Sequence, residues 1–166
     1  MRRIKGLLSK IFSHSDPVKG TDGIGKRAKN NDSGISLFRY GFDGTIGGGN
    51  YSYSVTREGD AAVFTCGRMD YPEPEETVLA ADGAILDRLD ELCRSCGIAC
   101  WDGFDKRNAA VCDGEGFDLS VTFCDGKSVT ARGKNAFPRG YREFCEGLHA
   151  ILDPLRDKAA ESEEQE

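Results

Sequence analysis

Four residues in the second half of the chain have types and spacing that suit a zinc ion. Cys93 and Cys96 are separated by two residues, and Cys145 and His149 by three, which matches the spacing of paired zinc ligands. Each pair falls on a predicted helix, and two helices on one face of a sheet would bring the pairs together. The three cysteines also lie in apolar helical stripes, where a reduced thiol packs as a small hydrophobic group. Core packing is the favoured interpretation, and a metal-binding domain is the alternative.

Cys145 and His149 also have the i, i+4 spacing of a nucleophile and its base on one helix. Such a dyad needs a further group that orients the histidine, together with an open cleft, and the sequence indicates neither. The chain has two histidines in all, which leaves few options for acid–base chemistry. We therefore predict a protein that is not an enzyme and that needs no cofactor.

Two loops hold polar groups that could bind an ion. Carboxylates crowd one predicted connection, at Asp102, Asp105, Asp113, Glu115 and Asp118. Their order departs from that of a calcium-binding EF-hand loop, so a solvated acidic loop is the favoured interpretation and calcium binding the alternative. Glycines at 44, 47, 48 and 49 join two predicted strands without a following helix or lysine, which indicates a hairpin loop and not a phosphate site.

The elements that would position these residues follow from the hydrophobic pattern. Strands are predicted at 35–42, 51–56, 61–68 and 117–123, with another through 129–131 and an edge strand through 77–79. Helices are predicted over 82–96 and 139–156. Strands, helix, strands and helix in that order predict an α+β domain, with an antiparallel sheet that carries both helices on one face.

Turn residues predict the registers of two hairpins. A two-residue loop at Glu58-Gly59 would place Val55 opposite Ala62. At Asp125-Gly126 the hydrophobic register instead favours a three-residue loop with Gly126 in the left-handed conformation. That loop places Val121 opposite Val129.

Single residues mark where the helices begin and end. Asp82 is placed to cap the first helix, and Gly97 to end it in the left-handed conformation. Pro154 should kink or end the last helix, and we expect residues 157–166 to form a disordered acidic tail.

Trp101 and Phe104 are the aromatic residues of the connection between the first helix and the second hairpin. We expect both rings to turn into the core while their acidic neighbours stay in water. The alternative is an interaction loop, because aromatic side chains are enriched at the centres of interfaces.

A longer pattern includes these residues. Trp101-Asp102-Gly103-Phe104 is followed by an alternating segment, Asp113-Gly114-x-x-Phe117-x-Leu119-x-Val121-x-Phe123-x-Asp125-Gly126, and then by Phe137-Pro138-x-x-Tyr141. This pattern resembles that of a family of small bacterial α+β proteins with no assigned activity. The resemblance covers about residues 35–156 and implies a fold unit without implying any chemistry.

The charges divide the chain into a basic arm and an acidic body. Residues 1–31 hold eight Lys or Arg and two Asp, a net charge of +6, whereas residues 32–166 hold 14 basic and 26 acidic residues, a net charge of −12. Residues 1–12 predict an amphipathic basic helix that could dock on a protein partner or an anionic membrane. Its docking residues are Arg2, Arg3, Ile4, Lys5, Leu7, Leu8, Lys10, Ile11 and Phe12. Residues 13–34 would form a flexible linker to the α+β domain at 35–156.

The same charge distribution limits the partners. Nucleic-acid affinity comes mostly from Lys and Arg that displace counterions, so we expect no nucleic-acid binding by the acidic body. Residues 4–12 are a poor match to a secretory signal, and the odd count of seven cysteines favours reduced thiols. We therefore expect a cytoplasmic interaction domain, with peripheral attachment to the membrane through the arm.

Overall fold

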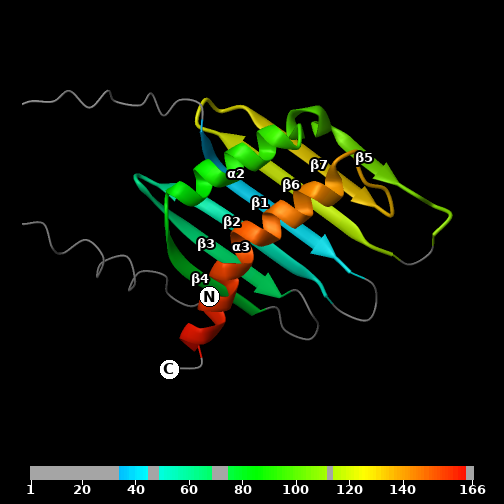
Figure 1. Ribbon diagram of the computed structural model, residues 1–166. Helices are drawn as coiled ribbons and strands as arrows, with labels where there is room; N and C mark the ends of the chain where they lie inside the picture. The colour runs from blue at the N-terminus through cyan, green and yellow to red at the C-terminus, as the bar shows by residue number, and fades with distance from the viewer. Residues whose placement is uncertain (1–33, 45–48, 69–74, 112–113, 164–166) are drawn as a thin grey trace, which may run out of the picture.

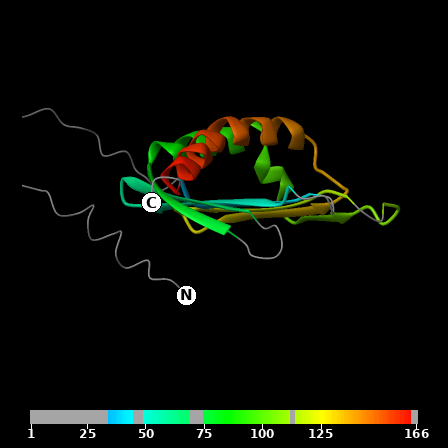
Figure 2. The ribbon, with the colours of Figure 1, turned by 90° about the horizontal axis from the view of Figure 1, so that it is seen from below.

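The computed structural model describes residues 34–44, 49–68, 75–111 and 114–163 (Figure 1). These ranges form a seven-stranded sheet with the order β4-β3-β2-β1-β6-β7-β5. The strands are β1 Ile35–Asp43, β2 Tyr51–Glu58, β3 Ala61–Arg68, β4 Glu75–Asp82, β5 Phe104–Arg107, β6 Gly116–Phe123 and β7 Ser128–Lys134. The α-helices are α2 Ala84–Ser95 and α3 Tyr141–Glu163, with a short 3-10 helix η3 at Ile98–Trp101. Both α-helices cover one face of the sheet, which confirms the predicted α+β fold (Figure 2).

Alternating side chains in the central strands produce one apolar and one polar face. Phe38 of β1 lies between Val55 of β2 and Val121 of β6, and all three are fully buried under the helices. Arg39, the next residue, is exposed on the open face. Successive side chains of a strand point to opposite faces of the sheet. The register that buries Phe38 therefore also places Arg39 on the open face.

The β6–β7 hairpin has the predicted register. Val121 pairs with Val129, and Leu119 pairs with Ala131. Gly126 has a φ of 83°, the left-handed conformation that the bulged turn requires.

The predicted partners in the β2–β3 hairpin are wrong by two residues. Glu58 pairs with Ala61, so the turn is Gly59-Asp60 and Val55 faces Phe64 instead of Ala62. Gly59 has a φ of 63°, which suits the first turn position of a tight hairpin. A shift of two residues keeps the same side chains on the same face, so the predicted apolar face is correct although the pairs are not.

The structure extends the predicted edges of the sheet. The expected edge strand through 77–79 is β4, which pairs with β3 along eight residues. Phe104–Arg107 forms β5, which pairs in parallel with β7 where the sequence indicated only a connection. This segment has three charged residues in four positions, so its composition does not indicate a strand.

Helix α2 begins close to the predicted cap. Gly83 is the N-cap residue, and the Asp82 carboxylate accepts a hydrogen bond of 2.8 Å from the Ala84 N–H. A Cβ at Gly83 would collide with the backbone oxygen of Asp60, which explains the glycine at the cap. Gly97 has a φ of 67° and ends the helix as predicted.

Helix α3 is longer than predicted. It continues through Pro154 to Glu163, so residues 157–163 are helical, which corrects both the expected tail and the expected end of the domain at 156. Leu152 is fully buried and Ala159 is 1% exposed, so the turns on both sides of Pro154 pack on the sheet. This packing offsets the backbone hydrogen bond that proline removes.

No helix in the described ranges is long and apolar enough to cross a membrane. The predicted basic helix at 1–12 and the linker up to residue 33 lie outside the described residues.

Candidate functional site

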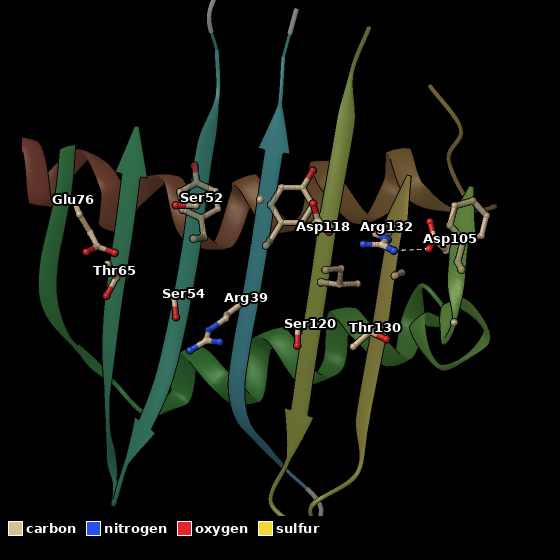
Figure 3. A pocket seen from close by; sticks show the side chains of 17 residues that line it. Arg39, Ser52, Ser54, Thr65, Glu76, Asp105, Asp118, Ser120, Thr130 and Arg132 are labelled. Atoms are coloured by element: carbon tan, nitrogen blue, oxygen red, sulfur yellow. Dashed lines mark hydrogen bonds and ion pairs between the residues drawn. The ribbon is translucent and has the colours of Figure 1, made fainter. Parts of the chain in front are cut away.

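A hollow of about 730 Å³ lies on the open face of the sheet (Figure 3). All seven strands contribute to its lining. The polar side chains that line it are Arg39, Ser52, Ser54, Thr65, Glu76, Asp105, Asp118, Ser120, Thr130 and Arg132. Small-molecule sites in proteins usually measure about 300–1,000 Å³, so the hollow has the size of a ligand site. We call it the open-face groove.

Arg39 lies at the centre of the open-face groove, in a row of hydroxyl groups. The strand registers place Ser54 and Ser120 beside Arg39, Thr65 beyond Ser54, and Thr130 beyond Ser120. Among the described residues no carboxylate oxygen lies within 4 Å of the Arg39 guanidinium. Arg39 is therefore a cation surrounded by neutral hydrogen-bonding groups.

The neighbouring row explains the depth of the groove. Gly41 lies between Ser52 of β2 and Asp118 of β6, and a Cβ built at Gly41 would meet nothing within 4 Å. Beyond Asp118, Arg132 forms an ion pair of 2.7 Å with Asp105 of β5. The hydrogen bond from Arg132 lowers the pKa of Asp105, and the reciprocal interaction raises the pKa of Arg132. A missing side chain at the centre of a wide polar face therefore leaves space for a ligand.

No motif in the sequence indicates this groove. Alternation in β1, β2 and β6 is the sequence signal that could have found part of it, because it places Arg39, Ser54 and Ser120 on the face opposite the core. The space above Gly41 has no such sequence signal, because it depends on which strands lie side by side.

A second polar cluster, which we call the α3 seam, lies on the covered face. Tyr40, Tyr51 and Tyr53 come from β1 and β2, and Tyr141, Cys145, His149, Asp153 and Arg156 come from α3. The helical residues from 141 to 153 recur every four positions, so they share one side of the helix.

His149 is at the centre of the α3 seam. Its Nδ1 lies 3.1 Å from Asp153 Oδ1, and its Nε2 lies 2.9 Å from the Tyr51 hydroxyl. The Tyr53 hydroxyl donates to the same Asp153 oxygen at 2.9 Å and accepts a hydrogen bond of 3.2 Å from Arg156. Burial alone would raise the pKa of Asp153, but the hydrogen bonds from His149 and Tyr53 outweigh it and lower that pKa. These groups satisfy one another and tie α3 to β2.

Burial keeps the tyrosine hydroxyls of the seam protonated. Burial raises the pKa of Tyr51 to about 12 and raises the pKa of Tyr40 further. The Tyr40 hydroxyl shares a hydrogen bond of 2.7 Å with Tyr141 and lies 3.5 Å from Cys145 Sγ. A Cys145–His149 dyad, which their spacing would allow, is not formed, because Cys145 contacts Tyr40 while His149 contacts Tyr51 and Asp153.

The candidate zinc ligands are placed as core side chains. Cys93 is 4% exposed, and burial raises the pKa of its thiol to about 12, which favours the protonated form over the thiolate that binds zinc. Cys96 and Cys145 are half-buried beside the core, and His149 belongs to the α3 seam. In the described part of the chain, no three His, Cys, Asp or Glu side chains gather closely enough to hold a metal ion.

The carboxylates of the predicted acidic loop are dispersed. Asp105 and Asp118 lie on strands of the open face, and Asp102 accepts a hydrogen bond of 3.0 Å from the Thr130 N–H. Asp113 lies outside the described residues. The glycines at 44 and 49 belong to the connection from β1 to β2, and no helix follows them.

Trp101 and Phe104 pack on the covered face. Trp101 is 4% exposed, and its Nε1 donates a hydrogen bond of 3.1 Å to the Arg139 carbonyl. Its ring packs edge to face against the Phe144 ring, with 5.4 Å between the ring centroids. Phe104 is half-buried and stacks on Phe117, with 6.2 Å between the ring centroids. The indole therefore belongs to the core, as expected, and presents little surface to a partner.

Comparison with models of protein families finds none that matches the chain, and comparison with curated proteins also finds no match. The geometry of the groove and the charges of the chain are therefore the features that point to a function.

Proposed function

We propose that this chain is a non-catalytic binding domain that holds a small ligand in the open-face groove. The observation that carries this proposal is a hollow of about 730 Å³ lined by hydroxyls, carboxylates and guanidinium groups. No histidine or cysteine is among the described residues that line it. Such a lining supplies hydrogen bonds and charge, which hold and orient a ligand, without an evident nucleophile and base.

The basic arm supplies a second, separate contact in this proposal. Its net charge of +6 is opposite to the net charge of −12 on the remainder of the chain. Each Lys or Arg near an anionic lipid surface contributes about 1 kcal/mol, so the arm can hold a cytoplasmic protein at a membrane reversibly. An acidic protein partner would be recognised by the same charges.

A variant whose groove is filled by a large side chain tests ligand binding even though the ligand is not identified. Because a Cβ at Gly41 would meet nothing within 4 Å, Gly41→Trp can start from the backbone without a clash and direct a bulky ring into the groove. Thr56→Trp is the matched control, because Thr56 is exposed on the open face of β2 but does not line the groove.

Each protein is incubated with the small-molecule fraction of a cell extract, desalted, and weighed by native mass spectrometry. We expect wild type and Thr56→Trp to retain an additional mass that Gly41→Trp loses. Retention of the same mass by Gly41→Trp, or no retained mass in wild type, contradicts the proposal.

A further inference from the structure

We propose that the ligand of the open-face groove is a short peptide with free ends, whose carboxylate pairs with Arg39 and whose ammonium pairs with Asp118. This inference rests on the proposed binding function and names its ligand class. It accounts for two features of the groove: a central guanidinium that forms no ion pair with any described residue, and three carboxylates elsewhere in the lining against the two guanidinium groups of Arg39 and Arg132.

The surroundings of Arg39 suit a carboxylate. A guanidinium presents parallel N–H groups that match the two oxygens of a carboxylate. The hydroxyls of Ser54 and Ser120, on the two adjacent strands, can each donate one further hydrogen bond to those oxygens. Figure 3 shows the guanidinium turned toward β2 and the side of Ser54, above the floor of the groove.

The surroundings of Asp118 suit an ammonium group. Asp118 pairs in register with Arg132, and Arg132 already forms its ion pair of 2.7 Å with Asp105. Arg132 therefore pairs with Asp105 and only influences Asp118 through its charge, which leaves the Asp118 carboxylate for a cation from the ligand. Among the described residues no Lys, Arg or His nitrogen lies within 4 Å of the Asp118 carboxylate.

The backbone spacing of the two charged residues suits a short peptide. Asp118 is two positions along β6 from the residue that pairs with Arg39, and such diagonal neighbours have Cα atoms about 7–8 Å apart. Figure 3 shows the Arg39 side chain extending toward β2, away from Asp118. An extended dipeptide or tripeptide spans roughly 7–10 Å. The rest of the hollow of about 730 Å³ then takes the side chains of the peptide.

A phosphate fits the same site poorly. Phosphate sites commonly use unpaired backbone N–H groups at a helix N-terminus or several cations together. The central strands under the groove, β3, β2, β1, β6 and β7, pair with neighbours on both sides, and the groove also contains the carboxylates of Glu76 and Asp118. A doubly charged anion would be repelled by these groups, whereas a dipolar peptide is attracted at both ends.

The test uses trialanine in three forms: with free ends, with an acetylated N-terminus, and with an amidated C-terminus. Isothermal titration of the full chain should show that each capped form binds at least about tenfold more weakly than the free form, a loss of about 1.4 kcal/mol. Arg39→Ala should abolish the discrimination against the amide alone. Asp118→Asn should abolish the discrimination against the acetylated form alone.

Matched charge changes on the covered side control for long-range electrostatics. Arg88→Ala and Glu91→Gln remove the same charges from exposed positions of α2, and both should bind all three forms as wild type does. Equal binding of the three forms by wild type, or no binding of any form, overturns the peptide assignment. If trialanine fails while Gly41→Trp still loses the mass captured from extract, the binding function stands and the ligand class is wrong.

Discussion

Gly41 and Gly126 show two different reasons for a glycine. Gly126 has a φ of 83° and no atom within 4 Å of a built Cβ, so its constraint is the backbone conformation and not space. Gly41 has equal space and an ordinary strand conformation, so the fold does not require glycine there. A residue that the fold does not require, at the centre of the hollow, is consistent with a role in leaving the groove open.

These two positions give a paired prediction for stability. Gly126→Ala should lower the free energy of unfolding by about 1 kcal/mol or more, because a Cβ is strained in the left-handed conformation. Gly41→Ala should cause no loss, since alanine is favoured over glycine inside a strand. Denaturant unfolding of both variants measures the two values, and an equal effect would show that the turn at Gly126 is not constrained as described.

At the scale of the elements, the α3 seam joins the last helix to the centre of the sheet. Its tyrosine hydroxyls, imidazole and carboxylate lie between apolar layers, and each has a hydrogen-bond partner. Buried polar groups that are fully paired favour one position of a helix over its neighbours, because a shift along the sheet would leave them unpaired.

The seam predicts how stability depends on alkaline pH. Burial raises the pKa values of Tyr40, Tyr51, Tyr53 and Tyr141 above the ordinary value of 10.0, to about 12 for Tyr51. Above pH 10 the unfolded chain loses phenolic protons that the folded chain retains. Stability is therefore fully present below that pH and falls as pH rises through the raised values.

A spectroscopic titration checks this directly. Of the five tyrosines in the chain, these four should not ionise before the protein unfolds, so tyrosinate absorbance and loss of structure should rise together. Ionisation of most phenols near pH 10 in a folded protein would contradict the burial of the seam.

The unexpected length of α3 gives a prediction about truncation. Because Ala159 is 1% exposed, removing residues 157–166 should lower the melting temperature, whereas removing residues 164–166 should not. A loss of 1 kcal/mol corresponds to about 2–4 °C in a domain of this size. Equal melting temperatures for the two truncations would mean that the last turns of the helix contribute nothing.

The sequence could predict those elements whose evidence is local. The left-handed Gly126 and the β6–β7 register follow from alternation and turn chemistry within a few residues. Strand β5 could not be predicted, because Asp105-Lys106-Arg107 is too polar to indicate a strand, and its pairing with β7 is a tertiary contact. The end of α3 was misplaced for the same reason, since the pattern shows Pro154 but not the packing of Ala159.

The candidate site was less predictable than the fold. The spacing of Cys145 and His149 matches that of a dyad or of zinc ligands. Their hydrogen-bond partners are instead tyrosines about 100 residues away, and no local sequence pattern shows those contacts. The open-face groove required the order of the strands, since Arg39 is flanked by residues from β2 and β6 that are distant in sequence.

At the scale of the whole molecule, both helices cover one face of the sheet and leave the other face open (Figure 2). The covered face is apolar and the open face is polar, and the sequence before the domain is basic. The arm should therefore be separable from the fold. We expect a chain that starts at Gly34 to melt at the same temperature as the full chain, and a fall of several degrees would show that the arm packs on the domain.

The arm should nevertheless determine membrane binding. Co-sedimentation with anionic vesicles should be strong at low salt, weaken as salt is added, and disappear when residues 1–12 are deleted. Gly41→Trp should bind vesicles as wild type does, because it changes only the groove. Binding that persists after the deletion would contradict the role assigned to the arm.

The central claim is that a ligand occupies the open face and not the helical side. Backbone amide shifts, recorded while the protein is titrated with the extract fraction that it retains, test this claim most directly. We predict that the shifted amides lie in β1, β2, β6 and β7 around Arg39, and that α2 and α3 are unchanged. Shifts concentrated in the helices, with the strands around Arg39 unaffected, would contradict it.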